Sequence, residues 1–379
     1  MKVLYLTEQD PRDASSWSGI PLSMYRLLRQ NGCSLDVVAD RTGTTTSKLR
    51  SRLRPGWRPA TADEIIAKAE RRIRSSRTDV IFAPVASRLV SRIETHVPIV
   101  YFSDGTVTSV YRRKPFSDYY RLPNSENASA EEYEGLLQTR EKAESETLKR
   151  TNMAVYPSQW ALASARDDYH VPESRLRLLP IGANLPENDL PTRPPQRECG
   201  RPVRLLYVGA DWHRKGGDLI LSCMDELALQ GLPATLTIVG CQPEAAVGRD
   251  DIDVIAYLNK NSVRDVRRMI EMLSNHHFLL LPSRAEAYGV APAEAMAFGL
   301  PAIVSGIGGL ATVVNDGISG AVLSDGSTGA DYANKILTLY DDPDAYKDLS
   351  HAAFDDYQRR LAWPNFGRRM MDIFREVVR

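Results

Sequence analysis

The sequence has few cysteines and no arrangement of them at metal-binding spacing. Its four cysteines, scattered along 379 residues, are Cys33, Cys199, Cys223 and Cys241. A predicted strand begins near the N-terminus with no signal peptide before it. This pattern predicts a reducing, cytoplasmic environment.

Long apolar runs and an excess of charge are also absent. No apolar stretch approaches the roughly 18 residues that a membrane-spanning helix needs. Lys and Arg number 48, as do Asp and Glu, so the zero net charge gives no global case for nucleic-acid binding. Neither GxGxxG after the first predicted strand nor GxxxxGK[ST] anywhere is found, which argues against a dinucleotide-binding dehydrogenase or a P-loop NTPase.

What the sequence does contain is a repeated alternation of short apolar runs and amphipathic segments. A length of 379 residues exceeds the usual size of a single core, so two domains are expected. Strands separated by helices predict right-handed crossovers and parallel sheets. The predicted strands are Val3–Leu6, Asp36–Ala39, Val80–Ala83, Ile99–Phe102, Ala154–Tyr156, Leu176–Leu179, Leu205–Val208, Leu236–Val239, Val254–Tyr257, Phe278–Leu281, Ala302–Val304 and Ala321–Leu323.

A proline-rich segment divides the two series of strands. Residues 186–203 carry five prolines and almost no apolar pattern, which predicts a linker. We therefore expect an α/β protein with Rossmann-like βα domains over 1–185 and 204–362 that face each other across a cleft. The final segment, 363–379, has helical spacing after a proline and is expected to cross back onto the first domain.

The most informative stretch is Ser283–Gly299, which follows the apolar run Phe278–Pro282. The run suits a fully buried parallel strand, and a glycine after an Ala-rich turn suits the end of a helix. Pro292 fits a first helical turn, where its missing N–H costs nothing. The helix should therefore begin near Gly289 or Val290.

Two glutamates flank the predicted start of this helix. Glu286 lies in the loop, and Glu294 lies about one turn inside the helix. Free N–H groups at a helix start attract phosphate, and a carboxylate on either side accepts hydrogen bonds from hydroxyl groups. A sugar nucleotide fits this arrangement. The alternative is an ordinary capped helix with Glu286 solvated and Glu294 in a surface ion pair.

A second motif opens the second series of strands, in Tyr207–Asp218. A strand ends at Gly209, a loop carries Arg214 and Lys215, and a helix starts after two glycines. The two cations are suited to a diphosphate at the same sheet edge as the glutamates. The alternative is a solvated basic turn.

At these residues the sequence resembles the retaining glycosyltransferases of the GT-B fold, family GT4 (glycosyl transferases group 1). Glu286 and Glu294 match the family's Glu-x7-Glu pattern, and Lys215-Gly216 matches its Lys-Gly at the start of the second domain. The resemblance is strong over about 204–325 and looser over 1–185. It implies an enzyme that transfers a sugar from a nucleotide diphosphate sugar to a hydroxyl acceptor, with retention of the anomeric configuration. Glycans, lipid-linked glycans and small molecules are all candidate acceptors, and polysaccharide biosynthesis is a typical setting.

The resemblance also implies roles for residues. The second domain would bind the donor, with Glu286 on the sugar hydroxyls and Glu294 on the ribose. Arg214 and Lys215 would neutralise the diphosphate. The donor loop that assists them with its N–H groups consists of Ala287, Tyr288, Gly289 and Val290, and Gly19 would close over the diphosphate from the acceptor-binding first domain.

Two positions depart from the family's pattern. Ala210 stands where many members have an arginine, so that Arg214 has to supply the second positive charge. Asp104 follows the fourth predicted strand, where many members have a histidine. At that strand end it is placed to accept a hydrogen bond from the sugar, as a second catalytic residue beside Glu286. The alternative for Asp104 is an Asx turn before Gly105.

No metal or other cofactor is expected. Asp251-Ile-Asp253 has an Asp-x-Asp spacing, but it precedes a predicted strand instead of following one, which favours a surface loop. His276 and His277 are neighbours that do not face the same way, and no third ligand is evident.

The stretch 44–77 holds ten Lys or Arg against three Asp or Glu, with Leu53 and Trp57 among them. A solvated face is one interpretation. An anionic acceptor or an anionic membrane surface is the other, and the latter would place the protein at the inner face of the membrane.

Other functions remain open at this stage. The changes at Ala210 and Asp104 are also compatible with a non-catalytic partner subunit that binds a nucleotide sugar. A GT-B phosphorylase or a nucleotide-sugar epimerase is the alternative among enzymes. The sequence does not identify the base, the sugar or the acceptor.

Overall fold

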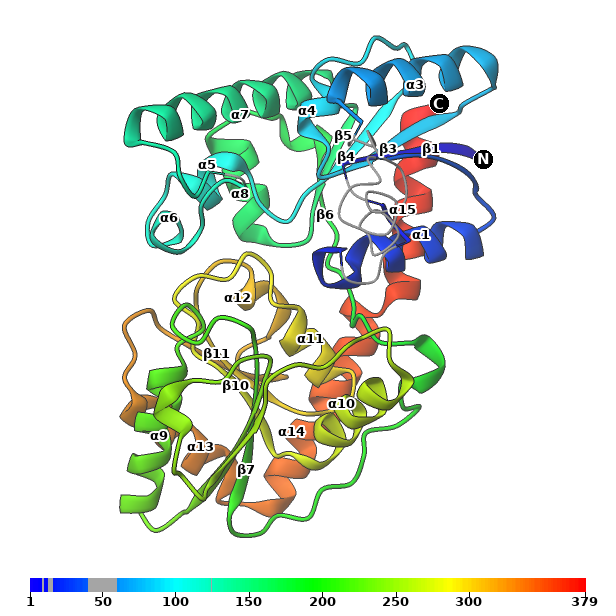
Figure 1. Cartoon of the computed structure of the whole chain (residues 1–379). Coiled ribbons are helices and arrows are strands. Elements are labelled where there is room, and N and C mark those ends of the chain that lie inside the picture. Colours follow the sequence, from blue (N-terminus) through cyan, green and yellow to red (C-terminus); the bar gives the residue numbers. More distant parts are fainter. Residues whose placement is uncertain (9, 13–15, 40–59, 124) are drawn as a thin grey trace. The chain divides into compact units, whose positions relative to one another are not determined.

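The chain forms two compact units, seen in a computed structural model (Figure 1). Unit 1 consists of Met1–Leu179 together with Trp363–Arg379, and unit 2 of Pro180–Ala362. The residues that the structure describes are 1–8, 10–12, 16–39, 60–123 and 125–379.

Each unit is built around a six-stranded parallel sheet, which confirms the predicted α/β class. The strand order is β2-β1-β3-β4-β5-β6 in unit 1 and β12-β11-β10-β7-β8-β9 in unit 2. The strands of unit 1 are β1 (Lys2–Thr7), β2 (Ser34–Ala39), β3 (Val80–Pro84), β4 (Ile99–Phe102), β5 (Met153–Tyr156) and β6 (Leu176–Leu178). Those of unit 2 are β7 (Val203–Val208), β8 (Ala234–Val239), β9 (Ile252–Ile255), β10 (Phe278–Leu281), β11 (Ala302–Ser305) and β12 (Gly320–Leu323).

Helices alternate with these strands. In unit 1 they are α1 (Ile20–Gln30), α3 (Ala62–Ser75), α4 (Ser87–Val90), α5 (Val107–Tyr111), α6 (Phe116–Tyr119), α7 (Ala130–Arg150), α8 (Gln159–Asp167) and α15 (Trp363–Val378). In unit 2 they are α9 (Gly217–Leu229), α10 (Val263–Asn275), α11 (Val290–Met296), α12 (Leu310–Val313), α13 (Gly329–Tyr340), α14 (Pro343–Asp356) and a π-helical turn at Tyr357–Leu361. Short 3-10 turns lie at Ser16–Gly19, Glu173–Arg175, Glu187–Asp189 and Glu244–Ala246.

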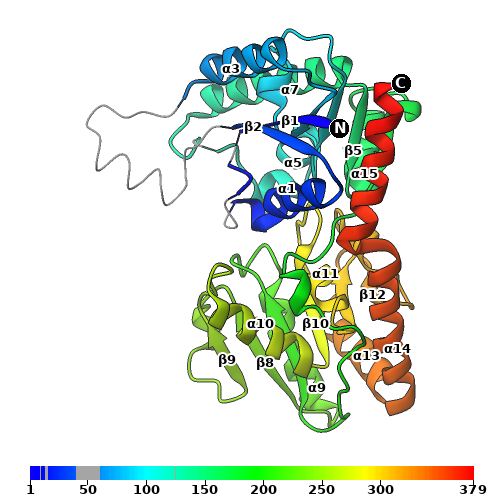
Figure 2. The ribbon, with the colours of Figure 1, turned by 90° about the vertical axis from the view of Figure 1, so that its right-hand side faces the viewer.

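The C-terminal helix α15 packs on unit 1, as the sequence predicts (Figure 2). Its Phe366 and Phe374 meet Phe102 and Phe82 of the sheet edge-to-face, with ring centroids 5.9 and 5.8 Å apart. The helix α1 lies beside it. Helices α3, α4, α7 and α8 supply the apolar cluster on the other face of the sheet. Burial of aromatic surface of this kind is a main source of the stability of such a layer.

In unit 2 the strand β10 is buried along its whole length, as its apolar sequence requires. It leads into α11, where six of seven residues are buried. Four of the seven are alanine or proline, and these small side chains let the helix pack closely on its neighbours. The start of α11 is consequently held in a fixed position at the end of β10.

The proline-rich segment 186–203 is part of unit 2, and the contacts divide the chain at Leu179–Pro180, earlier than the predicted linker. The Arg197 guanidinium fixes the segment by donating hydrogen bonds to backbone carbonyls of Leu273, Phe298 and Gly299 at 2.7, 2.8 and 3.0 Å. The spacing of prolines carries no signal for such an anchor, because it depends on one long polar side chain.

The basic stretch lies only partly within the described structure, since 44–59 fall outside it. In the part that follows, α3 begins with a capping box between Thr61 and Glu64. Three of its basic side chains, or of those just after it, have acidic neighbours: Arg72 with Asp36 (3.9 Å), Arg74 with Glu70 (3.8 Å) and Arg77 with Asp79 (3.7 Å). Among the helices described, none has both the length and the apolar character that crossing a membrane requires.

Candidate functional site

The basic loop after β7 is brought against the end of β10 by two glycines. At Gly209 a side chain would collide with the stem of Lys215, so the glycine leaves room for the lysine to lie across the strand end. Gly216 has φ +70° and no space for a Cβ beside the carbonyl oxygen of Pro282. The backbone carbonyl of Arg214 accepts a hydrogen bond from Arg284 N at 2.8 Å. The two loops therefore form one rigid surface.

Three predicted site residues meet on this surface. Lys215 Nζ lies 2.9 Å and Arg214 Nη1 3.6 Å from Glu286 Oε2. The side chains are only 14%, 14% and 13% exposed, for lysine, arginine and glutamate. Glu286 Oε2 is shielded from solvent and accepts no well-aligned hydrogen bond in the described structure. The alternatives of a solvated Glu286 and a solvated basic turn are therefore wrong.

Arg214 is held in place by several further contacts. Its Nη1 donates a hydrogen bond to Ala285 O at 2.7 Å, and its Nε lies 3.3 Å from Asp211 Oδ2. Ala210, in the same loop, is exposed and carries no charge. Arg214 is therefore held beside Glu286 as the second cation next to Lys215.

Glu294 lies on α11, whose N-cap is Gly289 with φ +100°. The helix begins at Val290, as predicted. Glu294 is only 3% exposed, and its Oε1 accepts a hydrogen bond from Lys260 Nζ at 2.6 Å. It is thus not part of a surface pair between two exposed side chains. Lys260 was missed by the sequence analysis because a single lysine in the polar loop after β9 has no distinctive spacing.

The side chain of Tyr288 anchors the donor loop from inside unit 2. Its hydroxyl donates to Ile181 O at 2.6 Å and accepts from Ile181 N at 3.0 Å, so the side chain points into the protein. Burial raises the pKa of Tyr288. On the other side of the loop, Gly309 N donates to Glu286 O at 3.1 Å, and a Cβ on this glycine would lie 2.5 Å from Ala287 O. Ala287 and Tyr288 accordingly shape the loop through their backbone.

In unit 1, Asp104 contacts the segment that precedes Gly19. Trp17 Nε1 donates a hydrogen bond to Asp104 Oδ2 at 3.0 Å, and Gly19 is the N-cap of α1 two residues further on. Trp17, Ser18 and Gly19 all have positive φ, at 44°, 55° and 86°. Such a strained run persists only where the surrounding structure imposes it, and it is often found at functional sites. Trp17 was not identified from the sequence, where nothing distinguished it from a core aromatic.

The residues considered for a metal are engaged elsewhere. Asp251 pairs with Arg249 at 2.8 Å, and Asp253 lies within β9. His276 contacts Met272 O and Thr237 Oγ1, while His277 accepts from Arg204 N at 3.0 Å. Burial lowers the pKa of His277 to about 4. Over the described ranges, no cluster of three or more His, Cys, Asp or Glu side chains is arranged to hold a metal ion.

The geometry of unit 2 can be compared with known families. Residues 192–356 match the model of the glycosyl transferases group 1. This region belongs to that family. It contains Arg214, Lys215, Lys260, Glu286 and Glu294, so all the charged side chains grouped above in unit 2 fall within it.

Individual known proteins are similar to this chain in sequence or in fold. A D-inositol 3-phosphate glycosyltransferase from Corynebacterium kroppenstedtii is 25% identical over 207 residues, which are 51% of this chain and 46% of the relative. The chain thus spans about half the length of this curated relative. The structure of a glycosyltransferase from Rickettsia africae matches with a TM-score of 0.67 and 14% identity, over 100% of this chain and 98% of the other. An Anabaena protein, Alr3699/HepE, in complex with UDP-glucose, matches with a TM-score of 0.64 and 13% identity, over 99% and 100%. The fold is therefore GT-B, with two Rossmann-like units.

Proposed function

We propose that the protein is a retaining glycosyltransferase that transfers a sugar from a nucleoside diphosphate sugar to a hydroxyl acceptor. The observation that carries the proposal is the grouping of Glu286 with Lys215 and Arg214, next to the start of α11 and within the region that matches the family. Two cations and free backbone N–H groups suit a diphosphate, and a mostly buried carboxylate suits sugar hydroxyls.

In this proposal unit 2 binds the donor. Lys215 and Arg214 stabilise the negative charge that develops on the leaving diphosphate, which is the main electrostatic contribution to the rate. Glu294 accepts hydrogen bonds from the ribose, and Lys260 holds its carboxylate in position. UDP-glucose is the first donor to test, because the related fold of the Anabaena protein binds it.

Unit 1 presents the acceptor, with Asp104 accepting a hydrogen bond from a sugar hydroxyl. We assign Glu286 to the sugar hydroxyls and Glu294 to the ribose, so neither serves as the nucleophile of a covalent intermediate. We therefore propose that the acceptor oxygen attacks the anomeric carbon from the side on which the diphosphate leaves. The bond to the diphosphate breaks as the new glycosidic bond forms, and a leaving phosphate oxygen takes the acceptor's proton.

The donor can be found by a thermal-shift screen with UDP-, GDP-, ADP- and dTDP-sugars. A ligand at 100 times its dissociation constant adds about 2.7 kcal/mol to the stability. With the donor known, NMR of the anomeric proton of the product should show the donor's configuration. An inverted product would overturn the proposed mechanism, and binding of no nucleotide sugar would overturn the function.

Asp104→Asn tests the role of the acceptor side. The amide oxygen still accepts a hydrogen bond, so transfer should slow without being abolished, and donor affinity should stay unchanged. Complete loss of transfer with intact donor binding would make Asp104 a general base instead.

Divalent metal should be dispensable, because Lys215 and Arg214 already supply positive charge at the proposed diphosphate site. Transfer should therefore persist in EDTA. Loss of activity in EDTA and recovery with Mn²⁺ or Mg²⁺ would contradict this and return attention to Asp251 and Asp253.

A nucleotide-sugar-binding subunit without turnover is the second candidate. The neutral Ala210 and the Asp104 that stands in place of the family's usual histidine favour it. Purified protein that binds a donor, yet neither hydrolyses nor transfers its sugar over a panel of acceptors, would support this second function.

We also propose that the basic stretch 44–77 touches an anionic membrane surface in the cytoplasm. Its charge and its Leu53 and Trp57 support this interpretation. Binding to vesicles containing anionic lipid should weaken steeply with salt, since exposed charges are screened over about 10 Å at 0.1 M. Indifference to such vesicles at low salt would leave the stretch as a solvated face or a contact for a soluble acceptor.

A further inference from the structure

A buried carboxylic acid contacts the segment that follows Asp104. Glu144, on α7, is 2% exposed, and it has no salt-bridge partner among the described residues. A carboxylate without a cation is rarely kept in a protein interior, because burial of its charge is costly. The hydrogen bonds of Glu144 show which part of the chain it keeps in position.

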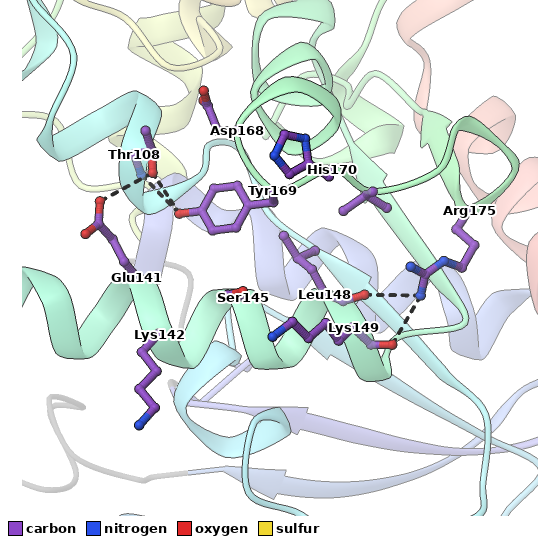
Figure 3. Close-up of a pocket in the computed structure, with 11 residues that line it drawn as sticks. Thr108, Glu141, Lys142, Ser145, Leu148, Lys149, Asp168, Tyr169, His170 and Arg175 are labelled. Carbon is purple, nitrogen blue, oxygen red and sulfur yellow. Dashed lines mark hydrogen bonds between the residues drawn. The ribbon is translucent and has the colours of Figure 1, made fainter.

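Glu144 satisfies the free N–H groups at the start of α5. Its Oε2 accepts a hydrogen bond from Val107 N at 2.6 Å, and Tyr169 donates a second one to the carboxylate. The same tyrosine hydroxyl lies 3.3 Å from Thr108 N and 3.0 Å from Thr108 Oγ1 (Figure 3). The first two amides of the helix therefore depend on Glu144, one directly and one through Tyr169.

These contacts are transmitted to Asp104 through a short and tightly packed connection. Only Gly105 and Thr106 separate Asp104 from α5. A Cβ on Gly105 would lie 2.7 Å from the Val110 side chain, and Thr106 Oγ1 lies 2.6 Å from Ser164 Oγ. With so little free space, a shift at the start of α5 has to move the segment that holds Asp104 against Trp17.

The surroundings of Glu144 favour its neutral form. Burial raises its pKa to about 7 from the usual 4.5, against the opposing effect of the hydrogen bonds from Tyr169 and Val107. Among the charged groups of the neighbouring elements, Arg88 of α4 is paired with Glu8 at 3.8 Å, and Asp168, after α8, is bonded to Ser164 and Arg113. The titratable groups from the elements packed around it are Tyr101 of β4, Tyr156 of β5, Tyr111 of α5, Tyr169 after α8, and Arg140 and Glu141 of α7 itself.

We propose that Glu144 is a positioning residue for the acceptor side: it fixes the segment 103–112 and hence Asp104, and it releases this segment when it loses its proton. The proposal rests on the role given to Asp104 above. Glu144 itself touches no substrate, so its effect on transfer is indirect.

The direction of the effect follows from linkage. Opening of the segment exposes the carboxyl group, which then regains an ordinary pKa near 4.5, whereas the closed arrangement has a pKa of about 7. Binding of the proton therefore stabilises the closed arrangement, and this stabilisation is complete below the lower of the two pKa values. The equilibrium constant for opening rises about tenfold per pH unit between the two values and levels off above the higher one.

The indole N–H of Trp17 offers a direct probe, because it is hydrogen-bonded to Asp104 Oδ2. In protein labelled with ¹⁵N-tryptophan, its cross-peak can be assigned with Trp17→Phe. We expect the peak to shift between pH 5.5 and 8.5 with a midpoint near 7. Hydrogen exchange of residues 103–112, corrected for intrinsic rates, should show protection that falls as the pH rises toward about 7 and levels off above that value.

Glu144→Gln keeps the shape and the acceptor for Val107 N but cannot ionise. In this variant both the shift and the loss of protection should disappear. Glu146→Gln, on the same helix in a surface pair with Lys149, should behave as wild type. The proposal is overturned if Glu144→Gln shows the same pH response as the wild type. It is also overturned if the wild type shows no pH response, and this second test needs no variant to fold.

These measurements need no ligand, so they are independent of the proposed function. Where transfer occurs, the wild-type acceptor KM should rise as the pH increases toward about 7 and level off above that value, whereas in Glu144→Gln it should stay level, with equal affinity for UDP in both. Failure of the wild type to transfer any sugar would overturn the proposed function, but it would leave the result on Glu144 standing.

Discussion

Each glutamate of the Glu-x7-Glu pattern has its own lysine. Glu286 pairs with Lys215 at 2.9 Å, and Glu294 pairs with Lys260 at 2.6 Å. Both carboxylates are largely removed from solvent, where an unpaired charge would be costly, and each lysine comes from a different loop. The pairs therefore stabilise the loops as well as preparing the site for an anionic ligand.

Replacing Lys215 with alanine should weaken binding of the nucleoside diphosphate. A hydrogen bond to a charged group contributes about 1.5–3 kcal/mol, so affinity should fall roughly 10- to 150-fold in calorimetric titration. Arg249→Ala, which removes two ion pairs elsewhere in the same unit, with Asp225 and Asp251, is the matched control and should bind normally. Equal affinities of Lys215→Ala and wild type would exclude Lys215 from the diphosphate site.

Lys260→Met should destabilise unit 2, because Glu294 would be left buried without its cation. We expect a loss of roughly 2 kcal/mol in urea unfolding, less than for a fully buried pair since Lys260 is partly exposed. Adding Glu294→Gln removes the stranded charge and should restore much of the stability. If the double variant is no more stable than the single one, the ion pair is not what holds Glu294 in place.

At the scale of elements, glycines decide how closely the two donor loops approach. Gly216 has φ +70° and faces the Pro282 carbonyl oxygen, whereas Gly231, with φ +79° after the end of α9, has nothing within 4 Å of the position of a Cβ. Both glycines have a left-handed backbone conformation that other residues rarely adopt. They differ in the space that is available for a side chain.

Gly216→Ala and Gly231→Ala therefore form a matched pair. Both should lose about 1–2 kcal/mol from the left-handed conformation. Only Gly216→Ala must also push the two loops apart, so only it should weaken nucleotide binding, measured by titration, together with a larger drop in stability. Equal effects of both changes would mean that the loops can separate without disturbing the site.

The sequence was sufficient for the buried central strands and for the start of α11. Burial on both faces makes a parallel strand apolar throughout, so Phe278–Leu281 and Ile99–Phe102 were predicted with their observed bounds. The edge strand β9 was predicted two residues late, at Val254–Tyr257 instead of Ile252–Ile255, because an edge strand alternates with polar residues such as Asp253.

Contacts between distant loops could not be predicted in the same way. Lys260 reaches Glu294 over 34 positions, and Trp17 reaches Asp104 over 87. Neither pairing has a local pattern, since it depends on where the loops leave the sheet. The side-chain contact of Tyr288 is a further example: its hydroxyl is bonded to Ile181 over 107 positions, which its place in the motif does not indicate.

At the scale of the whole molecule, the two units contain buried groups that titrate in opposite senses. Burial raises the pKa of Glu144 in unit 1 to about 7 and lowers that of His277 in unit 2 to about 4. His277 accepts a hydrogen bond from Arg204 N on Nδ1, so protonation there breaks a backbone contact. The two units should therefore respond differently to pH.

The expected signs follow from the proton uptake of each unfolded unit. For Glu144 the unfolded chain loses its proton first, so its contribution to stability is complete below pH 4.5 and is lost as the pH rises to about 7. For His277 the unfolded chain gains a proton first, so its contribution is complete above pH 6.5 and is lost as the pH falls to about 4. Each full change is roughly 3 kcal/mol.

Hydrogen exchange of the sheet strands can measure both contributions in the intact chain. From pH 5 to 6.5, the Glu144 contribution to protection of β4 should decrease, and the His277 contribution to protection of β10 should increase. Each contribution is measured as the difference in protection between the wild type and one variant, Glu144→Gln for β4 or His277→Asn for β10. The amide oxygen of the asparagine in His277→Asn can still accept a hydrogen bond from Arg204 N. Because other ionisable groups are common to each pair, they cancel in the difference. Differences of the same sign in both units would show that burial does not determine the titration of these two groups.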